Sequence, residues 1–258
     1  MTVQMTTPQA LKFAKHLYYS PAGHGKTHLL GTAQEDERTS PTCFIDFEAG
    51  TETLDGLDVD VFPIRTWADA YTLLEYLEEG AEIKMNGEWV DFAEYKSVSL
   101  DSLSEWYRAA QLERLKKMEK QRKEPDLVEM QDYNILTTQF RRVLRRYRDL
   151  PMHVFFSAHA KQVDDPRRGR IVVPDFPGQL SEEVAGLVSV VGYLAETAGE
   201  DEADRLLLLH GYSKYRIKAR GPWNQELPEE IEDPNVSDIL DIFGYKMNSK
   251  ASSKPTKS

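Results

Sequence analysis

Eight consecutive residues near the N-terminus combine two glycines, a lysine and a hydroxyl at fixed spacing: Ser20-Pro21-Ala22-Gly23-His24-Gly25-Lys26-Thr27. The glycines let the backbone turn tightly, so that consecutive N–H groups point into one concavity. Lys26 would place a cation on the β and γ phosphates of a nucleotide, and Thr27 would offer a hydroxyl to Mg²⁺. The run therefore predicts a loop that binds ATP or GTP, although Ser20 stands where glycine is usual. The predicted contacts are Ser20, Pro21, Ala22, Gly23, His24, Gly25, Lys26, Thr27 and His28.

Two carboxylates are expected beside this loop. Asp101 ends an apolar run, where it could hold Mg²⁺ through a water. Glu48 ends the run that follows the helix after the phosphate loop, where it could act as the base for an attacking water. Asp46 would lie on the same side of that strand, and it stays a competing candidate.

His159 follows another apolar run, and we expect it to contact the γ phosphate and report its loss. Residues 161–170 then read as a basic, glycine-containing loop that could contact a DNA backbone. An ordinary charged surface loop is the alternative for this segment. The cations are Lys161, Arg167, Arg168 and Arg170.

A late β-rich run, residues 215–219, would place alternate cations on one face. Lys218 and Arg220 could thereby reach the γ phosphate of a neighbouring subunit, as arginine fingers do. The alternative is the solvated face of an edge strand.

Strand and helix signals alternate along the chain, which predicts an α/β fold with a mostly parallel twisted sheet and helices on both faces. Ligands collect at the carboxyl ends of such strands, where the candidate residues fall. Asn86-Gly87 predicts a hairpin outside the main sheet. We expect strands at residues 15–19, 42–47, 59–64, 96–101 and 152–158, helices at 26–32, 66–79, 103–123 and 130–148, and a late strand pair at 206–210 and 215–219.

Composition sets the remaining limits. The net charge of −11 argues against a wholly electrostatic nucleic-acid binder but leaves room for local basic segments. No apolar run is long enough to cross a bilayer, and a single cysteine, Cys43, suits a reducing cytosol. We expect one core at residues 12–245, a flexible segment at 1–11, and a disordered Lys/Ser-rich tail at 246–258.

Taken together, these motifs resemble the RecA-like P-loop NTPase core. The run Ile45-Asp46-Phe47-Glu48 is similar to the strand that carries the catalytic glutamate in that group, which implies this role for Glu48. Residues 98–103 resemble its Walker B segment, which implies Mg²⁺ coordination by Asp101. More closely, the chain resembles the AAA-labelled phage nucleotide-binding proteins that include core-only single-strand annealing ATPases. The Ala158-His159 pair and the late Lys218-Ala219-Arg220 recur in that group.

This resemblance implies Mg²⁺-dependent ATP hydrolysis, single-stranded DNA binding, and support of recombination or strand annealing in the host cytosol. It also implies a homo-oligomer with ATP at the subunit interface, without a membrane partner. A single-strand-binding protein could dock on the acidic segments or the Lys-rich tail. Two other functions stay open: a ring-forming motor of helicase or packaging type, and an ATP-dependent regulator or scaffold without DNA activity.

Overall fold

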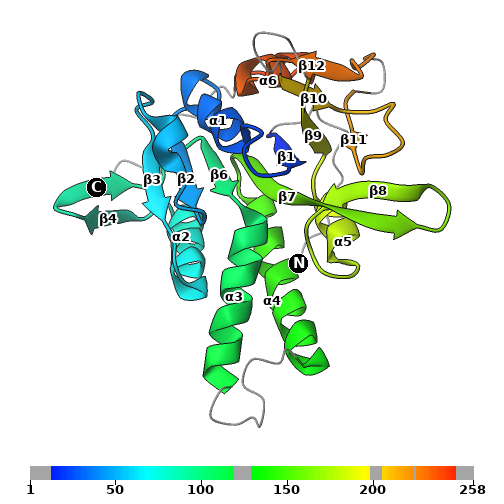
Figure 1. Ribbon diagram of the computed structural model, residues 1–258. Helices are drawn as coiled ribbons and strands as arrows, with labels where there is room; N and C mark the ends of the chain where they lie inside the picture. Colours follow the sequence, from blue (N-terminus) through cyan, green and yellow to red (C-terminus); the bar gives the residue numbers. More distant parts are fainter. Residues whose placement is uncertain (1–12, 119–128, 198–204, 223–224, 248–258) are drawn as a thin grey trace, which may run out of the picture.

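The computed structural model describes residues 13–118, 129–197, 205–222 and 225–247 (Figure 1). The expectations for residues 1–11 and for most of the 246–258 tail lie outside the described residues. The strands are β1 (Lys15–Ser20), β2 (Thr42–Asp46), β3 (Asp60–Pro63), β4 (Glu82–Met85), β5 (Glu88–Asp91), β6 (Ser97–Asp101), β7 (His153–Asp165), β8 (Gly169–Pro174), β9 (Val190–Glu196), β10 (Arg205–Leu208), β11 (Lys218–Ala219) and β12 (Glu230–Glu232). The helices are α1 (Lys26–Gly31), α2 (Trp67–Glu79), α3 (Leu103–Met118), α4 (Met130–Asp149), α5 (Leu180–Leu187) and α6 (Val236–Ile242), with short 3-10 helices η1 (Thr32–Glu35) and η2 (Thr51–Leu54).

One mixed sheet organises the molecule, in the order β12-β10-β9-β1-β7-β6-β2-β3. The strands from β9 to β3 run parallel, whereas β10, β11 and β12 are antiparallel to their neighbours. Helices α1 and α6 cover one face, and α2, α3, α4 and α5 cover the other (Figure 1). The predicted α/β fold with a mostly parallel sheet and helices on both faces is confirmed.

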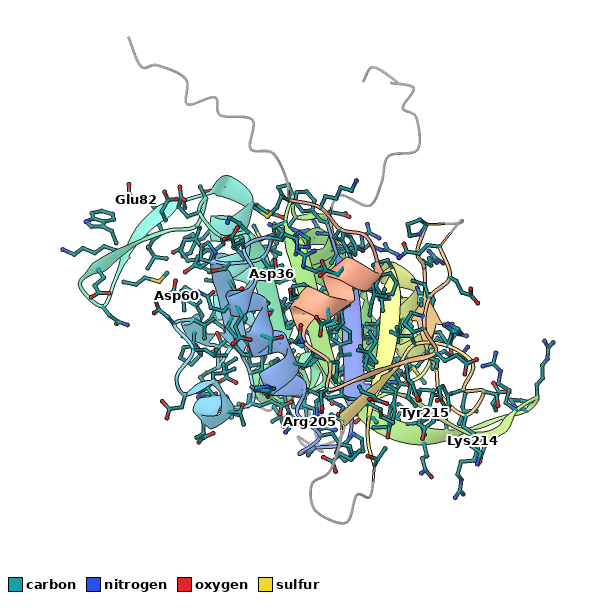
Figure 2. The ribbon with its side chains drawn as sticks, turned by 90° about the horizontal axis from the view of Figure 1, so that it is seen from above. Asp36, Asp60, Glu82, Arg205, Lys214 and Tyr215 are labelled. Atoms are coloured by element: carbon teal, nitrogen blue, oxygen red, sulfur yellow. The ribbon has the colours of Figure 1, made fainter. Side chains whose placement is uncertain are left out.

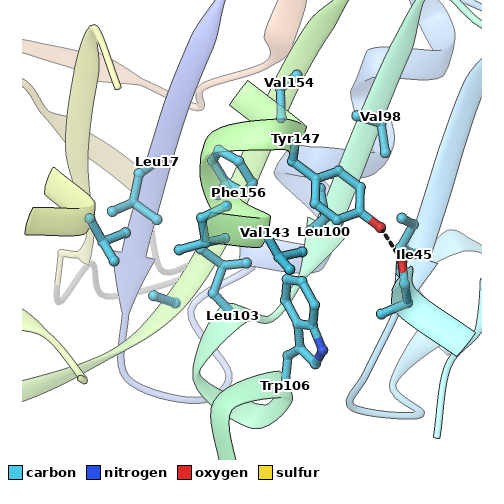
Figure 3. Packing of buried hydrophobic residues seen from close by; sticks show 14 of the residues in the cluster. Leu17, Ile45, Val98, Leu100, Leu103, Trp106, Val143, Tyr147, Val154 and Phe156 are labelled. Carbon is cyan, nitrogen blue, oxygen red and sulfur yellow. Dashed lines mark hydrogen bonds between the residues drawn. The ribbon is translucent and has the colours of Figure 1, made fainter. Parts of the chain in front are cut away.

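Strand residues alternate between two hydrophobic clusters, one on each face of the sheet. Along β1, Leu17 and Tyr19 join the cluster under α2 to α5, while Tyr18 joins the cluster under α1 and α6. In the larger cluster, the hydroxyl of Tyr147 on α4 donates a hydrogen bond to the carbonyl of Ala70 on α2 at 2.8 Å (Figure 3). This bond satisfies a polar group inside the core and ties two helices together.

Local signals explain several element ends. Thr66 Oγ1 accepts the N–H of Asp69 at 3.1 Å, which caps the start of α2. The Asn86-Gly87 turn joins β4 and β5, a hairpin in a sheet of its own. No helix within the described ranges is long and apolar enough to cross a membrane.

Two predicted segments differ from the structure. Strand β7 does not end at residue 158 but continues to Asp165, and it pairs with β8 in a long antiparallel hairpin. Residues 161–170 are therefore not a loop, since only residues 166–168 form the turn. The late strand pair is also wrong, because β10 and β11 do not pair with each other: both pair with β9.

Candidate active site

The carboxyl ends of the central strands bring the candidate residues to one edge of the sheet. Ser20 ends β1 directly opposite His159 of β7, and Asp46 ends β2 opposite Asp101 of β6. The Phe47 N–H donates to the Asp101 carbonyl at 2.7 Å, which holds the residue before Glu48 against the neighbouring strand. Four segments that are far apart in the sequence thus meet around the predicted phosphate loop.

The phosphate loop has the backbone shape that its glycines predict. Gly23 and Gly25 have φ values of 85° and 82°, in the region that favours glycine. Lys26 is buried at 5% exposure, and its Nζ donates to the Pro21 carbonyl at 2.9 Å. His24 contacts the Ala22 carbonyl, and His28 is exposed. The lysine ammonium therefore lies inside the turn of the loop, where a phosphate oxygen could replace the carbonyl.

Asp101 and Thr27 form an oxygen pair at the start of α1. Thr27 Oγ1 donates to Asp101 Oδ2 at 2.5 Å, and Ser157 Oγ donates to the other carboxylate oxygen. A hydroxyl beside a carboxylate matches the hard oxygen ligands that Mg²⁺ prefers, so these residues fit the implied ion. Thr27 and Asp101 would hold it, and it would supply positive charge against the phosphates.

Glu48 extends past the end of β2 on a tight turn. Asp46 is buried, and its Oδ1 accepts the N–H groups of Glu48 and Ala49, both at 2.9 Å. Its carboxylate is therefore committed to shaping the turn. Strand alternation left Asp46 and Glu48 as candidates for the base, and of the two only Glu48 has a carboxylate that faces the site.

His159 contacts Glu48 directly. Its Nε2 lies 3.1 Å from Glu48 Oε1 and 3.5 Å from Glu105 Oε1 on α3. The His159 N–H donates to Ser104 Oγ at 3.0 Å, which fixes the backbone at this point of β7. His159 thus sits between the candidate base and the start of α3.

Burial and nearby charges perturb the site's ionisable groups. Burial would raise the pKa of Glu48, but His159, Ser102 and Lys26 outweigh it, so this pKa lies below its usual value. Burial raises the pKa of Asp101, against the bonds from Ser157 and Thr27. Burial lowers the pKa of Lys26, against the attraction of Glu48 and Asp101. Glu48 is therefore a carboxylate at neutral pH, the form that accepts a hydrogen bond from water.

Lys218 and Arg220 lie at the other end of the sheet. Strand β11 pairs with Val190 and Val191, and the Arg220 N–H donates to the Ser189 carbonyl at 3.1 Å. Lys218 Nζ donates to the carbonyls of Ala185 and Val188 at 2.5 and 2.6 Å, at the end of α5. Burial lowers the pKa of Lys218 to about 8. Neither side chain belongs to the cluster around its own phosphate loop.

The basic residues lie on the β7–β8 hairpin. Lys161 is engaged by the Phe176 carbonyl and lies 3.6 Å from Asp175, so it is not a free cation. Arg167 and Arg168 are exposed at the turn, where their N–H groups donate to Asp165. Arg170 is 72% exposed and lies 3.9 Å from Asp164. Three arginines thus remain available at the end of the hairpin.

Three supporting residues escaped the sequence motifs. Ser157 bonds Asp101, Ser104 fixes His159, and Glu105 contacts the same histidine. Ser157 lies two residues before His159 on the same strand, so strand alternation could have indicated that it faces the same side of the sheet. No cluster of three or more His, Cys, Asp or Glu residues suited to a metal occurs in the described ranges. None of the candidate site residues lines the cavity of about 600 Å³ between β3, α2 and the β4–β5 hairpin.

Comparisons with known proteins give one family and several similar structures. Residues 12–221 match the family described as an AAA domain. No curated protein matches the chain. Similar solved structures include a KaiC-like protein of Pyrococcus horikoshii (12% identity, TM-score 0.44, covering 86% of this chain and 91% of that chain). They also include the flagellar accessory protein FlaH of Methanocaldococcus jannaschii (10%, 0.45, 85% and 85%) and the RadB recombinase (15%, 0.45, 85% and 86%).

The family match extends from the residues before β1 to just after β11, so it spans the phosphate loop, both acidic strand ends and the β7–β8 hairpin. It covers well over half of the chain. With the phosphate-loop motif at the carboxyl edge of a mostly parallel sheet, the chain has an α/β P-loop fold and belongs to the AAA domain family.

Proposed function

We propose that this protein is a phage-type RecA-like ATPase that hydrolyses ATP with Mg²⁺, binds single-stranded DNA and supports recombination or strand annealing. The observation that carries the proposal is the contact between Glu48 and His159, at the point where β7 leaves the sheet to form the basic hairpin. A change at the nucleotide would thereby reach a cationic element directly.

Each group near the loop has a role in this reaction. Lys26 would neutralise charge on the β and γ phosphates, and the loop N–H groups would orient them. Glu48, ionised and 25% exposed, would orient the attacking water and accept its proton. Asp46 would keep Glu48 in place through the two N–H groups that it holds.

His159 would transmit the state of the site to the hairpin. Its backbone is continuous with Lys161 through a single residue, and the Asp175 N–H donates to its carbonyl at 2.7 Å. Residues 161–170 carry four cations and two carboxylates, a net charge of +2 on a chain of net −11. This local excess supports contact with phosphate backbones.

The hydrolysis proposal is tested by Glu48→Gln, with Glu52→Gln as a matched control on the exposed part of η2. We expect turnover of Glu48→Gln to fall by about 10²–10⁴-fold while ATP binding persists, because only proton acceptance is lost. Glu52→Gln should keep its turnover. Unchanged turnover of Glu48→Gln would refute the assignment of Glu48 and favour a regulator or scaffold.

The DNA proposal is tested by Arg167→Ala/Arg168→Ala. Its control, Arg142→Ala/Arg145→Ala, removes the same charge from exposed positions of α4. We expect the hairpin variant to bind a single-stranded oligonucleotide more weakly, with the slope of log K against log salt reduced by about 1.4. DNA-independent ATP turnover together with no DNA binding at low salt would contradict this function. Displacement of a strand from a forked duplex would indicate a motor instead.

A further inference from the structure

Arg205, the first residue of β10, lies beside the phosphate loop although no motif indicated it. It pairs with Glu196, three residues beyond Tyr193, and Tyr193 lies opposite Tyr19 near the end of β1. Arg205 is therefore at the carboxyl edge of the sheet, on the side of β9 away from β1. Figure 2 labels it there.

The side chain of Arg205 packs against Gly25. A Cβ placed on Gly25 would lie 2.9 Å from Arg205 Nε, 3.0 Å from Cζ and 3.1 Å from Cδ. The positive φ of Gly25 favours glycine at this position, and the guanidinium end of Arg205 fills the space that a side chain would take. Within the described part of the chain, Arg205 has no ion pair with a carboxylate. A half-buried guanidinium against a phosphate-binding turn is placed to receive an anion.

The sheet order places Arg205 and the candidate base on opposite sides of the loop. Strand β10 is two positions from β1 in one direction, about 10 Å away. Strands β6 and β2, which end in Asp101 and Asp46, lie in the other direction. The γ phosphate must face Glu48 for hydrolysis, so Arg205 is on the side where the rest of the nucleotide leaves the loop.

Charge balance favours the same role. Lys26 contributes +1 near the loop, while Asp46, Glu48 and Asp101 contribute −3, so these four side chains sum to −2. Arg205 brings the sum to −1, which lowers the repulsion that an anionic nucleotide meets. Arginine also presents its N–H groups in a planar fork that binds two phosphate oxygens together.

We propose that Arg205 binds the α and β phosphates of a nucleotide held by the loop of the same chain, and so determines affinity for di- and triphosphates rather than the rate of hydrolysis. This inference depends on the proposed nucleotide-binding function. It adds a phosphate contact from β10 to those from the loop itself.

The test measures binding of ATP, ADP and adenosine by calorimetry with Mg²⁺ present, for wild type, Arg205→Ala and Arg205→Lys. Arg142→Ala, an exposed arginine of α4, is the matched control. We expect Arg205→Ala to bind ATP and ADP about tenfold or more weakly, because a charge-assisted hydrogen bond to phosphate is lost. Its affinity for adenosine should not change. Arg205→Lys should recover part of the loss. The KM for ATP should rise while kcat stays close to wild type.

Several outcomes would overturn the inference. The inference is wrong if Arg205→Ala binds ADP as tightly as wild type does. If Arg205→Ala also loses kcat at saturating ATP, Arg205 acts on the γ phosphate instead. A lower unfolding temperature of both Arg205 variants without nucleotide, together with equal weakening of adenosine, would indicate a structural role only. If wild type binds neither ATP nor ADP, the proposed function itself fails.

Discussion

Asp46 is the residue on which the geometry of the candidate base depends. Its Oδ1 accepts two consecutive N–H groups, and the second belongs to Ala49, which has a positive φ of 60°. A non-glycine residue in that conformation costs free energy, so the turn needs this support. In the proposed reaction Asp46 would therefore be a positioning residue, whose effect on turnover would pass through Glu48.

Asp46→Ala and Asp46→Asn separate this positioning from charge. Asparagine keeps an Oδ1 that accepts both N–H groups, whereas alanine leaves them without a partner. We expect Asp46→Ala to lower turnover by roughly 10²-fold through misplacement of Glu48. It should also lower the free energy of unfolding by about 1–3 kcal/mol through unsatisfied N–H groups. Asp46→Asn should keep most of the turnover and most of the free energy of unfolding. Equal losses in the two variants, measured by turnover and urea unfolding, would show that the charge matters instead.

The sequence alone could not decide between these two acids. Alternation puts Asp46 and Glu48 on the same side of an extended strand, and both types of side chain can act as a base. The decision comes from the turn after Asp46, which uses one carboxylate as a backbone acceptor. By contrast, the phosphate loop was predicted from sequence because its glycines, lysine and hydroxyl are all local to one turn.

At the scale of elements, strands β1 and β7 carry two buried histidines near their amino ends. The Ala14 N–H donates to His153 Nδ1 at 3.1 Å, and His16 Nδ1 lies 2.8 Å from the Tyr18 hydroxyl. Burial lowers the pKa of His16 to about 3 and that of His153 to about 4, from an ordinary 6.5. Both histidines are neutral in the folded protein at neutral pH.

These pKa values predict a loss of stability in mild acid. Below pH 6.5 the two histidines bind protons in the unfolded chain, whereas in the folded chain His153 binds one only near pH 4. The free energy of unfolding therefore has its full value near pH 7 and falls as the pH drops from 6.5 to about 4. His153 alone accounts for roughly 3 kcal/mol at its lower end. His153→Asn keeps an acceptor for Ala14 but does not titrate. Urea unfolding at pH 7 and pH 5 should show a smaller loss for this variant than for wild type. Identical losses would mean that His153 does not titrate on unfolding.

Strand lengths were predicted well where a run of residues is buried on both faces of the sheet, as in β1, β2 and β6, and poorly where an additional strand partner decides the length. Strand β7 continues past Ala158 through a mostly polar segment because β8 pairs with it outside the main sheet. No apolar run in the sequence predicts this pairing. Strand β11 is only two residues long. The same edge of β9 is already occupied by β10 from Tyr193 to Glu196, which leaves the three residues from Val190 to Gly192, and β11 pairs with the first two of them.

At the scale of the whole molecule, the phosphate loop and Arg220 lie at opposite ends of the sheet. The Arg220 N–H bonds Ser189, whose N–H in turn bonds the Lys15 carbonyl at the start of β1. Ser20, at the other end of β1, is five residues or about 16 Å away. Arg220 therefore cannot serve its own loop, and any role at a γ phosphate requires a second copy of the chain. Lys218 is a weaker candidate for that role, because its ammonium already holds two carbonyls at the end of α5.

A mixing experiment tests whether subunits complete each other's sites. We expect Arg220→Ala and Glu48→Gln each to lose turnover, the first without a change in unfolding temperature because the Arg220 side chain is exposed. In an equimolar mixture, the intact Glu48 of one variant can meet the intact Arg220 of the other. Random head-to-tail neighbours would make about a quarter of the interfaces complete, so about a quarter of wild-type turnover should return. Turnover that stays at the level of the separate variants, although the two are shown to exchange subunits, would exclude a role for Arg220 in a neighbour's site.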